Sequence, residues 1–324
     1  MTNQQQVQPL TNLPKVSIGI PSYNRPDMLR RALNSALSQD YENLEVVVCD
    51  DASPDPATLD VLREFKKNAR FRCQYCELNL GLVGNWQRCL AMAGGDLWLS
   101  LPNDDWLEPN AISRMVREFD DPQVGLVLCA RYAHMERGDE VVPLPGSGVI
   151  SGRDFITHRL QGKCGFPPTE LYRLDLVRDC GGYHDIGYAM DLMLELDIGA
   201  RSKIAYVNEP LTHHGCHAAT ASVAHPIQTM TTLVTLAKLA PGRYCEEVAS
   251  EIRASCVRGL YGRTIEGAFN RNREQTQTGC DGLKALDAPR GIQVKAAVFN
   301  MPFVQQSLCL LRWLKRRIFG WRVS

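Results

Sequence analysis

The chain has 324 residues, 44% of them hydrophobic, and its 36 Lys and Arg balance 36 Asp and Glu. A chain of this length buries a substantial core, in one large domain or two ordinary ones. Its neutral balance argues against a disordered chain and against a protein that binds nucleic acid. No apolar run approaches the roughly 20 residues that span a bilayer, and polar residues 1–15 predict no signal peptide. These features predict a cytoplasmic protein.

The twelve cysteines are scattered through apolar segments. Cys73 and Cys76 form the one close pair, and no second pair stands at the spacing of a zinc ribbon. We therefore expect buried free thiols in a reducing compartment, with metal or redox use of the close pair as the alternative.

Strands and helices alternate through the first part of the chain. Apolar runs predict strands at Val16–Ile20, Leu44–Cys49, Phe71–Cys76, Leu97–Leu101 and Val124–Ala130. Helical spacing predicts helices from Pro26 onward and at 57–67, 84–93 and 110–119. This alternation predicts an α/β fold with a Rossmann-like, mostly parallel sheet, helices on both faces, and ligands at the carboxyl ends of the strands.

The rest of the chain is less regular. Residues 136–170 are rich in Gly and Pro and predict a long excursion, followed by a helix at 186–200 and a strand at Ile204–Val207. Beyond about residue 222 the pattern is helical. We expect a flexible tail at 1–14, a main domain at 15–222 and a helical C-terminal region at 223–324.

Polar clusters follow three of the predicted strands. They are Pro21–Arg25, Asp50–Pro54 and Asn103–Asp105. Neighbouring carboxylates repel one another, and a hard divalent cation with oxygen ligands offsets that repulsion and also neutralises a diphosphate. Any one cluster alone is typical of turns and helix caps. Three of them at successive strand ends favour a functional site.

These clusters carry a resemblance to a known family. The segments VSIGIPSYNR, EVVVCDDASPD and NLGLVGNWQRCLAMAGGDLWLSLPNDDWL resemble the nucleotide-sugar-dependent family-two glycosyltransferases of the GT-A fold, in order and spacing. The resemblance covers residues 15–222, which it identifies as the catalytic domain. It implies a nucleotide-binding set that consists of Pro21, Tyr23 and Asp51 around the base, Asn79 and Gly81 facing the nucleotide, and Asp104 at the ribose.

The same resemblance implies a metal site and a donor class. Asp105, the last residue of the acidic motif, would bind Mg²⁺ or Mn²⁺, although Asn103 occupies a position that is often acidic in the family. Tyr23 is suited to stack on a base, and Asp51 is suited to accept a hydrogen bond from an imide N–H. UDP and dTDP present the same imide edge, so both UDP-sugar and dTDP-sugar donors fit.

The segment from Gly181 to Asp191 resembles the part of the family that holds the catalytic base. Asp191 matches the base, with Met190 where an acidic neighbour is common. A sugar hydroxyl is a poor nucleophile near neutral pH, and a carboxylate within hydrogen-bond reach can take its proton while the anomeric carbon is attacked. The structural alternative is an acidic residue favoured by the dipole at a helix N-terminus.

The run Thr212–His217 resembles a downstream family segment that ends in a His near the metal or diphosphate. His217 is the best match for a metal ligand and His214 the next. Gly215 stands where the family commonly has Arg, so one phosphate contact is expected to be missing.

The last part of the chain is basic. No acidic residue follows Asp287, and residues 303–319 combine apolar side chains with Arg312, Lys315, Arg316 and Arg317. This pattern is typical of a helix that lies in an anionic membrane surface. The alternative, which the sequence favours equally, is that residues 303–319 form a helix that packs its apolar face against the rest of the protein.

The sequence as a whole predicts an inverting, metal-dependent glycosyltransferase. It would move a sugar from a nucleoside diphosphate sugar to a hydroxyl of a saccharide or lipid-linked acceptor in cell-surface polysaccharide synthesis. Its location would be the cytoplasm, with peripheral association at the inner membrane face. The alternatives are a sugar nucleotidyltransferase, which needs a Gly-rich basic loop after the first strand, and a non-catalytic nucleotide-sugar-binding protein.

Overall fold

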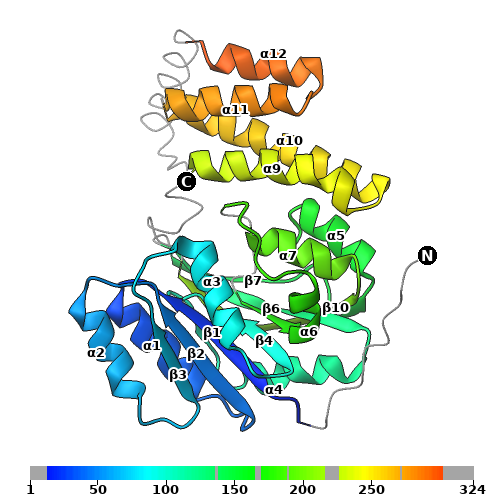
Figure 1. The fold of residues 1–324 in the computed structure, drawn as a ribbon. Helices are drawn as coiled ribbons and strands as arrows, with labels where there is room; N and C mark the ends of the chain where they lie inside the picture. The colour runs from blue at the N-terminus through cyan, green and yellow to red at the C-terminus, as the bar shows by residue number, and fades with distance from the viewer. Residues whose placement is uncertain are drawn as a thin grey trace. The chain divides into compact units, whose positions relative to one another are not determined.

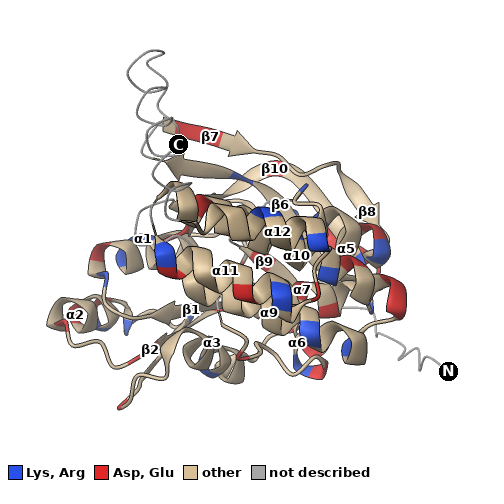
Figure 2. Cartoon of the chain, turned by 90° about the horizontal axis from the view of Figure 1, so that it is seen from above, with Lys and Arg blue, Asp and Glu red and all other residues tan. Residues whose placement is uncertain are grey.

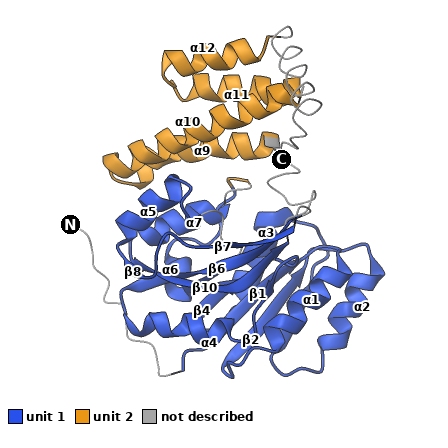
Figure 3. Ribbon diagram, turned by 180° about the vertical axis from the view of Figure 1, so that it is seen from behind, with its two compact units in different colours: residues 1–185, 190–217 blue, residues 186–189, 218–324 orange. Residues whose placement is uncertain are grey.

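A computed structural model describes residues 13–135, 138–164, 169–187, 190–215, 226–270 and 272–301. The chain divides into two compact units, and each is described by itself (Figure 3). The first comprises residues 1–185 and 190–217, and the second comprises 186–189 and 218–324.

The first unit begins with alternating strands and helices, as the sequence predicts (Figure 1). These elements are β1 Val16–Ser22, α1 Pro26–Leu37, β2 Leu44–Asp50, α2 Pro56–Phe65, β3 Phe71–Tyr75, α3 Gly81–Met92 and β4 Leu97–Ser100. Pro26 occupies the first turn of α1, where its missing N–H leaves no hydrogen bond unmade. Strands β1 and β2 are buried along their whole length, because helices cover both faces of the sheet here.

The chain continues through shorter strands and helices. They are β5 Trp106–Leu107, α4 Ala111–Val116, a 3₁₀ helix Arg117–Asp120, β6 Val124–Met135, β7 Gly138–Val142, β8 Gly148–Ile150, α5 Gly152–Leu160, β9 Glu170–Arg173, α6 Leu174–Asp179, α7 Met190–Gly199 and β10 Lys203–Gly215. The predicted excursion at 136–170 thus contains two short strands and a helix.

The strands form one mixed sheet in the order β3-β2-β1-β4-β9-β6-β10-β5. The predicted parallel pairing is found among β3, β2, β1 and β4, and between β6 and β10. Strand β9 runs antiparallel to both β4 and β6 and joins these two parallel parts. Its four residues, Glu-Leu-Tyr-Arg, are all buried, and a buried Glu and Arg in so short a run do not give a strand pattern.

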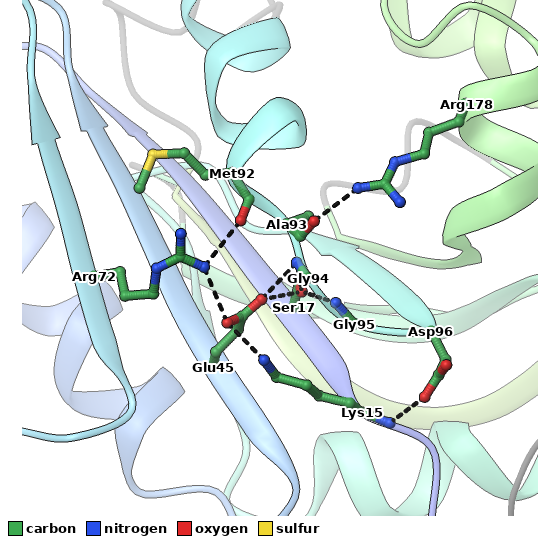
Figure 4. Close-up of polar contacts among 10 residues, drawn as sticks. All are labelled: Lys15, Ser17, Glu45, Arg72, Met92, Ala93, Gly94, Gly95, Asp96 and Arg178. Carbon is green, nitrogen blue, oxygen red and sulfur yellow. Dashed lines mark hydrogen bonds and ion pairs between the residues drawn. The ribbon is translucent and has the colours of Figure 1, made fainter.

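The amino ends of the parallel strands are held by an ionic network around Glu45, near the start of β2 (Figure 4). The Glu45 carboxylate accepts hydrogen bonds from Lys15 Nζ and Ser17 Oγ, at 2.8 and 2.7 Å. It also accepts the Gly94 N–H at 2.7 Å and contacts Arg72 Nη1 at 3.3 Å. These contacts tie β1, β2 and β3 to the end of α3 on the edge opposite the polar clusters.

The second unit consists of helices α9 Pro226–Arg243, α10 Glu246–Phe269, α11 Arg273–Ala285 and α12 Arg290–Phe299. Its buried side chains include Met230, Leu236, Ile252, Leu260 and Leu283. Acidic and basic residues are interspersed along α10 and α11, whereas the charged residues of α12 are Arg290 and Lys295 (Figure 2). Among the helices the structure describes, none has the length and hydropathy of a membrane span.

The ten cysteines within the described residues are all free, and seven of them are buried. Cys73 and Cys76 are half-buried. The prediction of buried free thiols is confirmed for most of them.

Candidate active site

The three polar clusters follow neighbouring parallel strands and therefore meet at one edge of the sheet. Strand β1 lies between β2 and β4, and Ser22 at its end is paired with Asp50 at the end of β2. Backbone hydrogen bonds continue the pairing beyond the strands, from Asp51 N to Ser22 O at 2.9 Å and from Leu101 N to Gly19 O at 3.0 Å. Ligands of α/β sheets bind at such an edge.

The loops at this edge hold an unusual backbone conformation. Asn24, Arg25 and Ala52 have φ angles of 57°, 60° and 59°, which side chains other than glycine rarely adopt. Ser53 stabilises both loops, because its hydroxyl accepts the Asn24 N–H at 2.8 Å and donates to the Asp50 carboxylate at 2.6 Å. Asp50 is therefore a turn-forming residue.

The Asp51 carboxylate is buried and fixes the loop before α3. It accepts hydrogen bonds from Leu80 N and Gly81 N, both at 2.9 Å, and from Arg88 Nη1 at 3.0 Å. Gly81 has a φ of +73°, which favours glycine. The Asn79 side chain accepts the same Gly81 N–H at 2.9 Å. The structure thus brings together three of the predicted nucleotide-binding residues.

Arg88 contacts the buried Asp51 and is not among the residues that the family resemblance implies for the site. Its guanidinium lies against a carboxylate that is 2% exposed and also donates to Leu78 O at 3.1 Å. The available signal was a single Arg in the middle of an otherwise uncharged helix segment. Trp86, two residues earlier on α3, has a structural role, because its ring packs against Trp98 and Tyr183.

The other predicted base-binding residues differ in exposure. Tyr23 is 46% exposed at the end of β1, so its ring is available to stack on a planar ligand. Pro21 is buried within β1, opposite Cys49. Tyr23 is thus the accessible member of this pair.

Asp104 joins the first and third clusters. Its carboxylate forms an ion pair with Arg25 Nη1 at 2.9 Å, and its backbone oxygen accepts from Arg31 Nη2 at 2.8 Å. The Arg31 guanidinium also lies 3.5 Å from the centre of the Trp106 ring. Arg25 and Arg31 therefore place positive charge beside the two adjacent aspartates.

Asp105 is completely buried and contacts the end of β10. Its Oδ1 lies 3.1 Å from His214 Nδ1 and accepts the Gly215 N–H at 3.0 Å. Burial raises the pKa of Asp105 above its usual range, and the hydrogen bond from His214 opposes that effect. Burial alone would lower the pKa of His214, but its hydrogen bond and charge interaction with Asp105 leave it raised. His217, the first choice for a metal ligand, lies outside the described residues.

Stacked rings of neighbouring residues hold the backbones of Asp105 and His214 close together. Trp106, next to Asp105, stacks on His213, next to His214, with ring centres 4.7 Å apart and planes 7° from parallel. Tyr132 stacks on His213 at the same distance. Because Arg31 covers Trp106 as well, this ring is part of the scaffold and not a platform for a ligand.

The carboxylate of Asp105 fits a hard cation that takes most of its ligands from phosphate oxygens and water instead of the protein. Within the described ranges no group of three or more His, Cys, Asp or Glu side chains could hold a metal. Mg²⁺ is usually bound by one or two carboxylates together with phosphate oxygens and water. Asp105 supplies such a carboxylate. Within the part of the chain that the structure describes, its Oδ2 has one hydrogen-bond contact, 3.4 Å to His214 Nδ1.

Asp191 lies in the first turn of α7 and is half-buried. One carboxylate oxygen accepts the Leu192 N–H at 2.7 Å. Burial and the negative charge of Glu195 raise the pKa of Asp191 to about 6, while the positive charge of Arg159 opposes the rise. Such a carboxyl is ionised at neutral pH and still binds a proton more readily than an ordinary aspartate.

Buried polar groups link Asp191 to the edge that carries the clusters. Glu170 at the start of β9 is paired with Ser100 at the end of β4, and their side chains are 3.4 Å apart. Burial and the negative charge of Glu195 raise the pKa of Glu170, and the negative charge of Asp191 adds to that rise. Glu170 could not be expected as a site residue from sequence, because β9 itself was not predicted.

A groove of about 590 Å³ lies along α1 and includes Arg31, which also contacts Asp104. It is lined by Asp27, Arg30, Arg31, Asn34, Ser35, Ser38 and Leu107, none of which is a predicted site residue.

Comparison with known proteins gives relatives that share part of this sequence. EpsH of Bacillus subtilis, named a putative glycosyltransferase, is 27% identical over 219 residues, which are 63% of this chain and 61% of EpsH. A Campylobacter jejuni protein named GalNAc(5)-diNAcBac-PP-undecaprenol beta-1,3-glucosyltransferase is 27% identical over 156 residues, 47% of this chain and 50% of its own length. The chain thus matches less than two thirds of either relative.

Solved structures share the fold at lower identity. Staphylococcus aureus TarS residues 1–349, in complex with UDP-GlcNAc, matches 92% of this chain and 92% of its own with a TM-score of 0.70 and 16% identity. The Pyrobaculum calidifontis mannosyltransferase PcManGT, in complex with GDP-Man and Mn²⁺, matches 97% of this chain and 90% of its own, with a TM-score of 0.57 and 18% identity.

The family itself follows from the sequence. The model of glycosyl transferase family 2 matches residues 17–178, half of the 324-residue chain, and this region holds β1, β2, β4 and all three polar clusters. The chain belongs to glycosyl transferase family 2.

Proposed function

We propose that this chain is an inverting glycosyltransferase that moves a sugar from a nucleoside diphosphate sugar to a hydroxyl of a saccharide or lipid-linked acceptor. The observation that carries the proposal is the meeting of Asp51 and the Asp104–Asp105 pair at the carboxyl ends of neighbouring strands. Asp191 is joined to this edge through Glu170, which is paired with Ser100 at the end of β4 and interacts with the charge of Asp191. A transferase needs a nucleotide contact, a diphosphate site and a proton acceptor close together.

The nucleotide contact is assigned to Asp51 and Tyr23. Among the residues that the structure describes, Oδ2 of Asp51 accepts one hydrogen bond, from Gly81 N. It therefore has a lone pair left for the imide N–H of a uracil or thymine base. Tyr23 is exposed beside it for stacking. The UDP-GlcNAc bound by TarS supports a UDP-sugar donor, with dTDP-sugar as the second choice.

The diphosphate site is assigned to Asp104 and Asp105. Asp105 would hold a divalent cation, Mg²⁺ or Mn²⁺. The candidates to join it are His214, which contacts Asp105, and His217, which the family resemblance implies. A bound cation supplies charge neutralisation for the leaving diphosphate. The Mn²⁺ and GDP-Man in PcManGT support this assignment.

Asp191 is assigned the role of base. It takes the proton of the acceptor hydroxyl while the new bond to the anomeric carbon forms and the bond to the diphosphate oxygen breaks. A single displacement from the opposite face inverts the anomeric configuration. The raised pKa of Asp191, about 6, suits this task near neutral pH.

The acceptor class rests on the relatives. The Campylobacter jejuni protein is named for an undecaprenol-linked acceptor, and other relatives are named chondroitin synthase or hyaluronan synthase. A lipid-linked or growing polysaccharide acceptor would place the protein at the inner membrane face. Residues 303–319, the proposed membrane contact, lie outside the described residues.

The test is a panel of UDP-, dTDP- and GDP-sugars, screened for thermal stabilisation and for hydrolysis with and without Mn²⁺. We expect a UDP- or dTDP-sugar to stabilise the protein, and we expect Asp105→Ala and Asp191→Ala to lower turnover at least about 100-fold. Asp60→Ala, an exposed aspartate on α2, is the control and should leave turnover unchanged. Near wild-type turnover in Asp191→Ala would show that the base lies elsewhere.

A further inference from the structure

Asp191 shares one face of α7 with a second acidic residue. Glu195 follows it by four residues, which brings the two side chains to within about 40° of each other around the helix. Glu195 is fully buried, whereas Asp191 is half-buried. Two like charges on one buried helix face need a specific reason to be there, because burial penalises each of them.

Arg159 of α5 holds the Glu195 carboxylate. Arg159 Nε donates to Glu195 Oε2, and Arg159 Nη2 donates to Oε1 at 3.2 Å. Both side chains are almost completely buried, with 3% and 0% of their surface exposed. This two-point ion pair keeps Glu195 charged and fixed in orientation.

Glu170 completes the cluster as a neutral acid. Its Oε2 accepts from Tyr172 Oη at 2.5 Å and from Ser100 Oγ at 3.4 Å. Its Oε1 meets no donor among the described residues, and the neighbouring Glu195 carboxylate raises the pKa of Glu170 through its charge and through a hydrogen bond that it would share with the protonated acid. A proton on Oε1 of Glu170, donated to Glu195, satisfies both observations, and burial together with the Glu195 charge raises the pKa of Glu170 accordingly.

We propose that Glu195, held by Arg159 and by the neutral carboxyl of Glu170, is a positioning residue that places a fixed negative charge beside Asp191. This inference rests on the proposed function, in which Asp191 is the base. The fixed charge makes Asp191 a stronger proton acceptor without touching the substrate. The acceptor's proton passes to Asp191 as the glycosidic bond forms, and it leaves to solvent after the diphosphate has departed.

Titratable groups from four elements interact with Asp191. They are Arg159 of α5, Glu170 of β9, Tyr183 of the segment before α7, and Glu195 of α7 itself. Tyr183 is neutral, because burial raises its pKa. Glu170 is neutral for the reason given above. Among these groups, Glu195 and Arg159 are therefore the two charges that act on Asp191.

The experiment measures the titration of Asp191 directly, without any substrate. The full-length protein is labelled with ¹³C at the aspartate carboxyl carbons, and the Asp191 signal is assigned by its loss in Asp191→Asn. The wild-type signal should titrate with a pKa of about 6. In Glu195→Gln the midpoint should fall by about one pH unit, because the like charge is gone while Arg159 remains.

Two further variants keep the cluster hydrogen-bonded. Glu170→Gln mimics the neutral acid and should leave the Asp191 midpoint where it is. The double variant Arg159→Gln/Glu195→Gln removes both charges but keeps amide partners, and its midpoint should lie between those of Glu195→Gln and the wild type. The double variant also replaces Glu195→Gln in the titration if that single variant does not fold.

Asp197→Asn is the matched control. Asp197 is buried on the same helix but lies six residues from Asp191, about 240° around the axis, where it contacts His184. The control should not move the Asp191 midpoint. An unchanged midpoint in both Glu195→Gln and the double variant would overturn the inference, and so would an equal shift in Asp197→Asn.

Turnover separates this inference from the proposed function. If Asp191 is the base, turnover should fall at low pH with a midpoint that matches the Asp191 titration midpoint measured by NMR in each variant. Turnover that persists in Asp191→Ala contradicts the proposed role of Asp191 as the base. If Asp191→Ala is inactive but the Asp191 titration midpoint is unshifted in Glu195→Gln, only the role of Glu195 is contradicted.

Discussion

Gly19 lies in the middle of β1, directly against the indole ring of Trp98 in β4. A Cβ atom at Gly19 would stand 1.9 Å from Trp98 Cη2, so no larger residue fits without moving the ring. Trp98 in turn donates from Nε1 to Tyr183 Oη at 3.0 Å, and Tyr183 precedes the helix of Asp191. Gly19 thus leaves room for Trp98, and Trp98 holds Tyr183 by a hydrogen bond in the segment before α7.

We expect Gly19→Ala to lower the free energy of unfolding by about 1–3 kcal/mol, because the fully buried Trp98 must shift. Urea unfolding followed by tryptophan fluorescence measures this change. Gly146→Ala is the control, since a Cβ there meets nothing within 4 Å, and it should be neutral or slightly stabilising. Equal effects of the two substitutions would contradict the packing argument.

Arg88 gives a second prediction at this scale. Without its guanidinium, the Asp51 carboxylate keeps its two backbone hydrogen bonds but loses its charged partner. We expect Arg88→Gln to weaken the binding of UDP about tenfold, because Asp51 is less well oriented for the base. Calorimetric titration with UDP and Mn²⁺ measures the affinity. Arg63→Gln, an exposed arginine of α2, should bind UDP as the wild type does, and unaltered binding in Arg88→Gln would contradict the assignment.

At the scale of elements, the Glu45 network holds the amino ends of three strands together (Figure 4). Burial alone would raise the pKa of Glu45, but hydrogen bonds from Lys15, Ser17 and Gly94 lower it to about 2. The folded state therefore binds this proton less readily than the unfolded chain does. The network contributes stability above the unfolded pKa of about 4.5 and loses it as the pH falls toward about 2.

We expect Glu45→Gln to lower the free energy of unfolding at neutral pH by about 2 kcal/mol, a value reduced because Lys15 and Arg72 are partly exposed. The difference between variant and wild type should shrink as the pH falls below about 4.5 and vanish near the folded pKa of about 2. Chemical unfolding across this range measures it. A difference that stays constant with pH would contradict the ionic origin.

At the scale of the whole molecule, the basic C-terminal segment is expected to bind the protein to an anionic membrane surface. We expect the full-length protein to sediment with anionic vesicles and not with neutral ones. Replacing Arg312, Lys315, Arg316 and Arg317 by Gln should remove this binding, because each basic residue near an anionic surface contributes about 1 kcal/mol. Equal sedimentation of the two proteins would reject the membrane contact and leave the docking helix as the explanation.

The alternation of strands and helices up to β6 could be predicted because each element carries its own periodicity. Pro26 at the start of α1 and the apolar runs of β1, β2 and β4 are local signals. The polar clusters could be placed at one edge for the same reason, since parallel strands bring their carboxyl ends together. The sequence alone thus determined the α/β core, its family and the residues at three strand ends.

Only the tertiary structure decided how these residues are partnered. Strand β9 is short, and its Glu170 and Arg173 are buried because partners from distant segments satisfy them. Arg88 on Asp51, His214 on Asp105 and Arg159 on Glu195 are contacts between residues 37, 109 and 36 positions apart. No local pattern encodes such contacts, because the charge and burial of each side chain depend on which distant group the fold brings against it.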